Sequence, residues 1–244
     1  MFYHEVVSPR ALPGDVFDYL LARGWYPMRQ MIFTTSHLDA AENLEPQPVP
    51  WLRYPVPEVK LRESHRRIIR KNRDYDLRLV SPFAHSPELN DLYRLYLDSV
   101  DFEGYPSVAA ATFEPDTDNI YDTRAFILRD RERIFGCGIF HRGETSVASI
   151  LHFYDPEYSA LSPGKYLILL TMDYCRRENI EWYYPGYVIE GNPRMNYKLF
   201  LGESAAQYYH PEPHPMNGSW KEFNRSILIT GESSRQTFRS DIPG

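Results

Sequence analysis

The sequence predicts an α+β fold with a small N-terminal region, and two observations lead to this prediction. Segments with helical spacing and segments with strand-like composition occur in mixed order, without the regular alternation of a parallel α/β protein. Three of the strand-like segments also follow one another with short, polar connections, which is typical of an antiparallel meander. With 244 residues, 43% of them hydrophobic and 25% charged, the chain is long enough for one globular domain with a small appendage.

The N-terminal region is predicted to end in a proline-rich connector. Residues 15–23 have the apolar spacing of a helix, and Gly24 follows where a helix commonly ends. A strand-like segment occupies residues 31–35. Five prolines then occur within residues 46–57, a composition typical of an extended, polyproline-like chain. We therefore expect a small N-terminal region, residues 1–57, and a main domain, residues 58–244.

The main domain is predicted to begin with two helices and to continue with the meander. The helical segments are residues 60–73 and 87–99; the meander strands are 124–129, 134–140 and 145–154; a helix at 163–178 and strands at 181–189, 204–209 and 223–229 follow. Ser162 suits the N-cap of the helix at 163–178, and Pro163 suits its first position. This order is also that of the GNAT acyltransferase fold, whose helix after the third or fourth strand points its N-terminus at the phosphates of the acyl donor. We therefore expect a GNAT-like fold with a mixed central sheet flanked by helices.

Charge is distributed unevenly along the chain. The net charge is −6, which argues against a protein that coats nucleic acid without specificity. Residues 60–73 nevertheless hold seven Lys or Arg residues and one Glu. The common explanation of such a run is a solvated helix face. Only Glu63 and Arg67 have the spacing of an i,i+4 ion pair, so the other cations are expected to be free for phosphate or carboxylate.

Membrane proteins and disulfide scaffolds are not expected. Residues 1–10 contain no apolar run behind a basic start, and the longest apolar stretch, near 166–170, is far too short to cross a bilayer. The only cysteines, Cys137 and Cys175, lie inside apolar patterns. We therefore expect a cytoplasmic protein with two buried thiols.

Three blocks of the sequence carry a family resemblance. Residues 153–166 (FYDPEYSALSPGKY) look like the FYDP-x-Y-x-x-L-S-x-G-x-Y signature of arginyl- and leucyl-tRNA–protein transferases. Residues 183–198 (YYPGYVIEGNPRMNYK) resemble their YY-x-G-Y-x-I-x-x-x-P-K-M-x-Y-K block, and residues 62–72 (RESHRRIIRKN) are similar to their basic helix. Gly24-Trp25 stands where the family has its GW pair. The resemblance to aminoacyl-tRNA–protein transferases spans residues 16–210.

One departure from the family concerns a cysteine-rich motif that has been linked to metal or cluster binding. Residues 25–57, where the family carries it, contain no cysteine, and the one histidine there, His37, has no companion ligands. We therefore predict that the protein binds no metal.

The resemblance implies a specific reaction. Arg or Leu would move from aminoacyl-tRNA to the N-terminal α-amine of proteins that begin with Asp or Glu, as in an N-degron pathway. An aminoacyl ester is already activated, so no cofactor is expected. The protein has to align the amine with the ester, remove a proton and stabilise the tetrahedral oxyanion.

Asp155 and Tyr154 are the predicted catalytic residues, because they lie at the junction between a strand and the helix start where this fold class places its chemistry. Asp155 would act as general base or orient the amine; the alternative is a turn that ends the strand. The residues predicted to bind substrate or tRNA are Arg66, Arg67, Arg70, Lys71, Ser162, Gly164, Tyr166, Tyr187, Arg194 and Lys198. For Tyr154 and Tyr166 the alternative to stacking on a terminal base is core packing, and for Arg194 and Lys198 it is surface solvation.

Two other functions stay open. A small-molecule acyltransferase of the same fold is disfavoured, because residues 161–166 keep only one glycine of a pyrophosphate loop and Pro163 removes a donor N–H. A single phosphate or the tRNA 3′ end remains compatible with that helix start. A protein that binds tRNA or acidic N-termini without catalysis is the second alternative, since the cysteine motif is missing.

Overall fold

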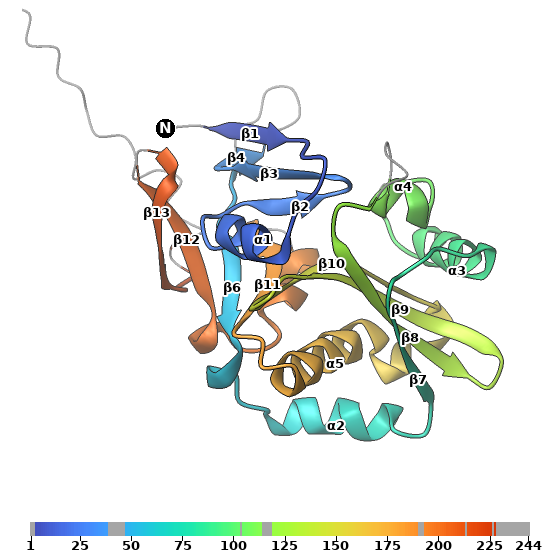
Figure 1. Ribbon diagram of the computed structural model, residues 1–244. Helices are drawn as coiled ribbons and strands as arrows, with labels where there is room; N and C mark the ends of the chain where they lie inside the picture. The colour runs from blue at the N-terminus through green and yellow to red at the C-terminus, as the bar shows by residue number, and fades with distance from the viewer. Residues whose placement is uncertain are drawn as a thin grey trace, which may run out of the picture.

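A computed structural model describes residues 3–38, 47–102, 104–113, 119–189, 193–212, 214–225 and 227. Eight strands form the main sheet in the order β13-β12-β6-β11-β10-β9-β8-β7, and a small sheet has the order β1-β3-β2 (Figure 1). The elements of the N-terminal half are β1 (His4–Val7), α1 (Gly14–Leu21), β2 (Tyr26–Met28), β3 (Met31–Thr35), β4 (His37–Leu38), β5 (Gln47–Pro48), β6 (Trp51–Pro55), η1 (Val56–Glu58), α2 (Glu63–Asn72), β7 (Asp76–Val80), α3 (Pro87–Asp98) and α4 (Val108–Thr112). The elements that follow are β8 (Asp122–Asp130), β9 (Arg133–Arg142), β10 (Ser146–Tyr154), η2 (Pro156–Leu161), α5 (Pro163–Arg177), β11 (Trp182–Tyr187), η3 (Pro193–Leu199), η4 (Glu203–Ala205), β12 (Gln207–Glu212) and β13 (His214–Glu222), where η marks a 3-10 helix.

The main sheet is covered on both faces. Side chains alternate along a strand, and on β8 Phe126 and Leu128 pack in one hydrophobic cluster together with α5, while Ala125 and Ile127 pack in another together with α3. The next strand, β9, is buried along nearly its whole length. Burial on both faces explains why its sequence is a continuous apolar run rather than an alternating one.

Strands β10 and β11 run side by side for only a short distance. They pair in parallel from Ser146 opposite Trp182 to Ala148 opposite Tyr184, with α5 as the crossover between them. Beyond that point β10 continues to Tyr154 along β9, with an irregularity after Ser149. Strand β11 instead follows β6, with its own irregularity between Tyr183 and Gly186. The two strands therefore separate in the middle of the sheet.

The α+β fold and the GNAT-like order predicted from the sequence are confirmed. The meander β8-β9-β10 is antiparallel, and α5 and the parallel strand β11 follow it. Ser162 occupies the N-cap of α5 and Pro163 its first position, as predicted, but the Ser162 side chain makes no capping bond. No helix within the described ranges is long and apolar enough to span a membrane.

Two predictions about segments were wrong. Residues 51–55 are not part of a connector but form β6, inside the main sheet between β12 and β11. The prolines at 50 and 55 stand before and at the end of this strand, where a missing N–H is tolerated, and the interior residues Trp51, Leu52 and Tyr54 are buried. The last strand was predicted at 223–229, but residues 223–225 are not in a strand and the described strand before them, β13, ends at Glu222; residues 226, 228 and 229 lie outside the described residues. The division of the chain after residue 57 stays a prediction.

Gly24 is placed where no other residue fits well. Its φ of +77° lies in the left-handed region, and it reverses the chain between α1 and β2. A Cβ at this position would lie 2.4 Å from Cδ1 of the Tyr209 ring, which is buried. Backbone conformation and lack of space therefore both require glycine here.

We expect Gly24→Ala to lower the free energy of unfolding by more than Gly202→Ala does. Gly202 also has a positive φ, of +124°, but a Cβ added there would meet nothing within 4 Å, so its substitution costs only the backbone strain, about 1–3 kcal/mol. The collision with Tyr209 should add roughly 1–3 kcal/mol in Gly24→Ala. Urea denaturation of both variants measures the difference, and equal losses would contradict the steric argument.

Candidate active site

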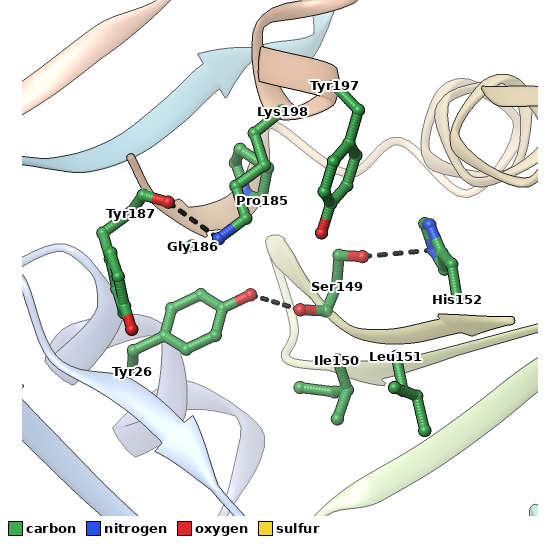
Figure 2. Close-up of a pocket in the computed structure, with 10 residues that line it drawn as sticks. All are labelled: Tyr26, Ser149, Ile150, Leu151, His152, Pro185, Gly186, Tyr187, Tyr197 and Lys198. Carbon is green, nitrogen blue, oxygen red and sulfur yellow. Dashed lines mark hydrogen bonds between the residues drawn. The ribbon is translucent and has the colours of Figure 1, made fainter. Parts of the chain in front are cut away.

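The gap between the separating strands β10 and β11 is a cavity of about 90 Å³ that opens to solvent (Figure 2). One wall comes from β10 and the other from β11, and β2 and η3 complete it. The lining residues are Tyr26, Ser149, Ile150, Leu151, His152, Pro185, Gly186, Tyr187, Tyr197 and Lys198. We call this cavity the strand-gap pocket. It follows directly from the early end of the β10–β11 ladder.

Tyr26 joins the small N-terminal sheet to the pocket. Its hydroxyl donates to the carbonyl of Ser149 and lies 3.2 Å from the carbonyl of Tyr184. It therefore gives a hydrogen-bond partner to backbone carbonyls at the point where the two strands separate. Its ring stacks on Trp51 of β6, with 5.2 Å between the centroids and 21° between the planes. The N-terminal region thus builds one wall of the pocket.

Lys198 brings a cation to the pocket. Its Nζ donates to the carbonyl of Tyr187 at 2.7 Å and lies 4.8 Å from the centroid of the Tyr187 ring. The side chain is half-buried, and this burial lowers the pKa of the Lys198 amine to about 8. At pH 7 the amine is therefore still mostly protonated.

The other lining groups that could carry charge are neutral near pH 7. His152 lies 3.2 Å from the hydroxyl of Ser149, and burial lowers the pKa of its imidazole to about 4. Burial raises the pKa values of the phenols of Tyr26, Tyr187 and Tyr197. No Asp or Glu is among the described residues that line the pocket. These residues therefore carry one formal charge, and it is positive.

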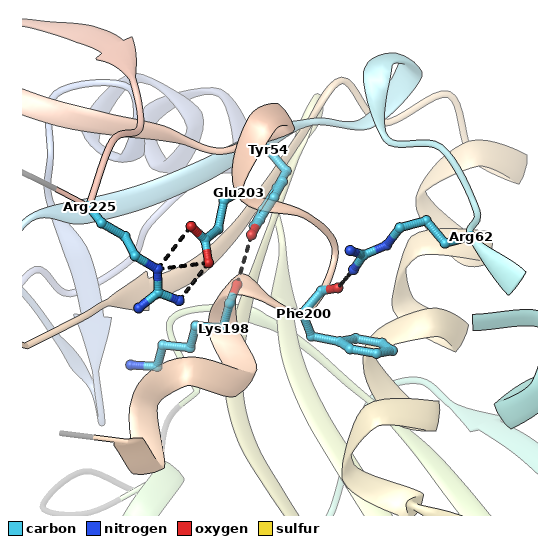
Figure 3. Close-up of polar contacts among 6 residues, drawn as sticks. All are labelled: Tyr54, Arg62, Lys198, Phe200, Glu203 and Arg225. Carbon is cyan, nitrogen blue, oxygen red and sulfur yellow. Dashed lines mark hydrogen bonds and ion pairs between the residues drawn. The ribbon is translucent and has the colours of Figure 1, made fainter. Parts of the chain in front are cut away.

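The segment that holds Lys198 is fixed from three sides (Figure 3). The hydroxyl of Tyr54 donates to the backbone carbonyl of Lys198 at 3.0 Å, and Arg62, just before α2, donates to the carbonyl of Phe200. Glu203 forms a bidentate ion pair with Arg225. These contacts fix the backbone of Lys198 while its amine points away from them (Figure 3).

Comparison with known proteins identifies the family. The description "Arginine-tRNA-protein transferase, C terminus" matches residues 88–206. An aspartate/glutamate leucyltransferase of Vibrio vulnificus is 27% identical over 191 residues, which cover 76% of this chain and 77% of that protein. The chain belongs to the aminoacyl-tRNA–protein transferase family. Arginyl-tRNA–protein transferase 1 of Saccharomyces cerevisiae is 35% identical over 89 residues, which cover 36% of this transferase and 18% of the yeast protein.

Among solved structures, the C-terminal domain of a putative lysylphosphatidylglycerol synthetase from Agrobacterium fabrum is similar with a TM-score of 0.44 and 15% identity. It covers 62% of this transferase and 50% of that chain.

The matched family region contains every residue that lines the strand-gap pocket except Tyr26. Of the binding residues predicted from the sequence, Tyr187 and Lys198 lie in the pocket of this transferase. The side chain of Arg194 lies outside the described residues. Sequence reasoning missed Tyr26, Ser149 and His152. A signal existed for Tyr26, which directly follows the Gly24-Trp25 pair, but its place opposite β10 depends on folding.

Asp155 has partners that occupy both of its carboxylate oxygens. It is 1% exposed, forms an ion pair with Arg133, and accepts a hydrogen bond from the backbone N–H of Glu157 at 3.0 Å, which caps η2. Arg133 also pairs with Glu157 at 2.9 Å. Asp155 is not among the residues that line the pocket. Its predicted role as general base stays a prediction.

The other residues predicted around the start of α5 lie beside one another. The half-buried ring of Tyr154 packs against Tyr96, with 5.3 Å between the centroids, and a Cβ on Gly164 would lie 3.4 Å from it. Ser162 has a left-handed backbone with φ of +58°. Tyr166 is buried in the core beneath the sheet. Packing thus accounts for Tyr166, whereas Tyr154 and Gly164 are partly accessible.

Helix α2 presents its cations differently from the prediction. The predicted ion pair between Glu63 and Arg67 is wrong, because Glu63 pairs with Arg70 at 2.6 Å and with Arg66 at 3.8 Å. Lys71 donates to the carbonyl of Ala160 at 2.9 Å, which ties α2 to η2, just before α5. The side chains of Arg66 and Arg70 remain more than half exposed, and Arg67 is exposed. The helix therefore keeps a solvent-facing positive surface close to the start of α5.

No three His, Cys, Asp or Glu side chains gather as a metal site would require in the part of the chain that the structure describes. The predicted absence of a metal is not tested by this finding. Cys137 and Cys175 are both free and buried, and burial raises the pKa of each thiol. They are therefore poor nucleophiles, as expected of structural thiols.

We expect Asp155→Asn to reduce stability more than it reduces catalysis. Asn can still cap η2, but the buried charge partner of Arg133 is lost, at a cost of about 1.5–3 kcal/mol. Thermal denaturation combined with a transfer assay separates the two roles. A rate loss of roughly 10²–10⁴-fold at an unchanged melting temperature would instead identify Asp155 as the base.

Proposed function

We propose that this protein transfers leucine from leucyl-tRNA to the N-terminal α-amine of proteins that begin with Asp or Glu, in an N-degron pathway of the cytoplasm. The observation that carries the proposal is the match over most of the chain to proteins named aspartate/glutamate leucyltransferase. The similarity to an arginyl-tRNA–protein transferase is confined to 89 residues. Arginine is therefore the second candidate for the transferred amino acid.

The donor tRNA would be held mainly by α2. Arg66, Arg67 and Arg70 are exposed on this helix, and arginine forks suit phosphate oxygens. Lys71 fixes the helix beside η2 and the start of α5, where Ser162 and Gly164 would approach the 3′ end of the tRNA. A positive surface in a chain of net charge −6 would direct the tRNA to this side of the molecule.

The strand-gap pocket is the proposed place of transfer. The reaction needs a neutral α-amine beside the ester carbon, in a site that limits access of water. An α-amine has an ordinary pKa of about 7.7–8.0, so near neutral pH a fraction of it is already neutral and able to attack. Tyr187 and Arg194 complete the proposed binding set, and Tyr154 and Asp155 remain proposed for the chemistry.

A transfer assay tests the function directly. Purified protein should move labelled leucine from leucyl-tRNA to peptides that begin with Asp or Glu, and it should do so without ATP, added metal or acetyl-CoA. We expect much slower transfer from arginyl-tRNA. Leucine transfer to no peptide, or turnover of acetyl-CoA in place of charged tRNA, would contradict the proposal; binding of tRNA without any transfer would support a non-catalytic protein instead.

Arg67→Ala tests the proposed tRNA surface. Loss of one charged hydrogen bond should weaken tRNA binding by about 5- to 100-fold, and the slope of log affinity against log salt should decrease by about 1. The matched control is Arg94→Ala on α3, which is also exposed and pairs with Asp91. Equal effects of the two substitutions in a filter-binding titration would show that α2 is only a solvated helix face.

A further inference from the structure

We propose that the strand-gap pocket is the receptor for the acidic first side chain of the acceptor protein, with Lys198 as the residue that binds its carboxylate. This inference rests on the proposed function for the presence of an acceptor. It adds which residue recognises the Asp or Glu and where that side chain is bound.

The charge of the pocket selects for an anion. Among the lining residues that the structure describes, Lys198 is the one with a formal charge near neutral pH, because His152 is neutral and none of them is a carboxylate. A half-buried ammonium without a counter-ion is unfavourable, and the lowered pKa of Lys198 expresses this cost. An anionic guest would remove the cost. A guest that carries a positive charge, such as an arginine side chain, would increase it.

The hydrogen bonds of the ammonium point to the same guest. An ammonium group has three N–H donors, and the structure gives this one a single bond, to the carbonyl of Tyr187. Figure 2 shows the amine at the edge of the open space between Tyr187, Tyr26 and Ser149. A carboxylate in this space would accept the remaining donors as a charge-assisted pair.

A side-chain carboxylate fits this pocket better than a tRNA phosphate does. The exposed arginines of α2 offer phosphates a solvated surface with several cations, whereas the pocket offers one amine inside a small cavity of about 90 Å³. Lysine also has a flexible four-carbon stem. The amine of Lys198 can therefore reach the carboxylate of either Asp or Glu, whose side chains differ in length by one methylene group. Binding the side chain here keeps the acceptor α-amine in the same gap.

The first test uses an uncharged isostere of the acceptor. We compare kcat/KM for peptides that begin with Asp and with Asn, in the wild-type protein, in Lys198→Met and in Lys198→Arg. The Met variant should lose about 10- to 100-fold in kcat/KM for the Asp peptide, the value of a charged hydrogen bond. It should retain its KM for leucyl-tRNA and discriminate Asp from Asn only weakly. Lys198→Arg, which keeps the charge, should retain more of the preference.

The pH dependence of the same ratio has a predicted sign. Lys198 is a cation below its pKa of about 8, and a bound carboxylate raises that value. The preference for Asp over Asn should therefore be full at pH 7 and decline as the pH rises well above 8. The α-amine pKa of each free peptide is measured separately and its titration is divided out of the ratio, because the Asp carboxylate raises the pKa of its own α-amine. A preference that is constant from pH 7 to 10 would overturn the proposal.

A binding measurement that needs no catalysis completes the design. In wild-type protein with isotope-labelled lysine, the Nζ resonance of Lys198, assigned from Lys198→Arg, should titrate near pH 8 without ligand. The Asp peptide should raise its pKa by at least about one unit, and the Asn peptide should not. A rise produced by a tRNA acceptor-stem fragment but not by the Asp peptide would assign the amine to phosphate and overturn the proposal. A rise with the Asp peptide in a protein that transfers no amino acid would instead refute the proposed function and leave this inference standing.

Discussion

The structure depends on one constraint, the early end of the hydrogen-bonded ladder between β10 and β11. Parallel pairing stops at Ala148 and Tyr184, although β10 continues to Tyr154. Strands that part inside a sheet expose backbone groups that must find other partners. At the gap these partners come from side chains: the hydroxyl of Tyr26 donates to the carbonyl of Ser149, and the amine of Lys198 donates to the carbonyl of Tyr187. Strands β9 and β6 pair with the other edges of β10 and β11. A cavity in the middle of the sheet is therefore compatible with a stable core around it.

The N-terminal region contributes to this arrangement more than an appendage would. The hydroxyl of Tyr26 lies within hydrogen-bonding distance of the carbonyls of Ser149 and Tyr184, at the point where β10 and β11 separate. Its ring stacks on Trp51. Trp51 in turn packs edge-on against Tyr187, with 5.0 Å between the centroids. One aromatic chain thus runs from the small sheet to the pocket wall. In this protein, which lacks the cysteine motif, the hydrogen bonds of Tyr26 and aromatic packing link the N-terminal region to the pocket.

Local features of the sequence predicted much of the fold, whereas the pocket required information that is not local. The helix from Pro163 and the three meander strands follow from apolar periodicity and short polar connections, which act between neighbouring residues. The gap between β10 and β11 depends on where a parallel ladder ends across a long crossover, residues 155–181, and no pattern within either strand shows this. For the same reason β6 was missed: its prolines are visible in the sequence, but its position between two central strands is not. The spacing of charges along α2 also could not predict that Glu63 pairs with Arg70 rather than with Arg67.

Asp155 and Lys198 are both charged residues of family motifs, but their surroundings in the structure differ. The carboxylate of Asp155 is 1% exposed and its charge is compensated by Arg133 and by the N–H of Glu157. Lys198 is half-buried beside a cavity whose lining offers its amine a carbonyl and an aromatic face but no carboxylate. A compensated charge stabilises the fold around it, while an uncompensated one in a pocket favours a ligand of opposite sign. The chemistry of recognition is therefore to be sought first at the charge that the fold leaves without a counter-ion.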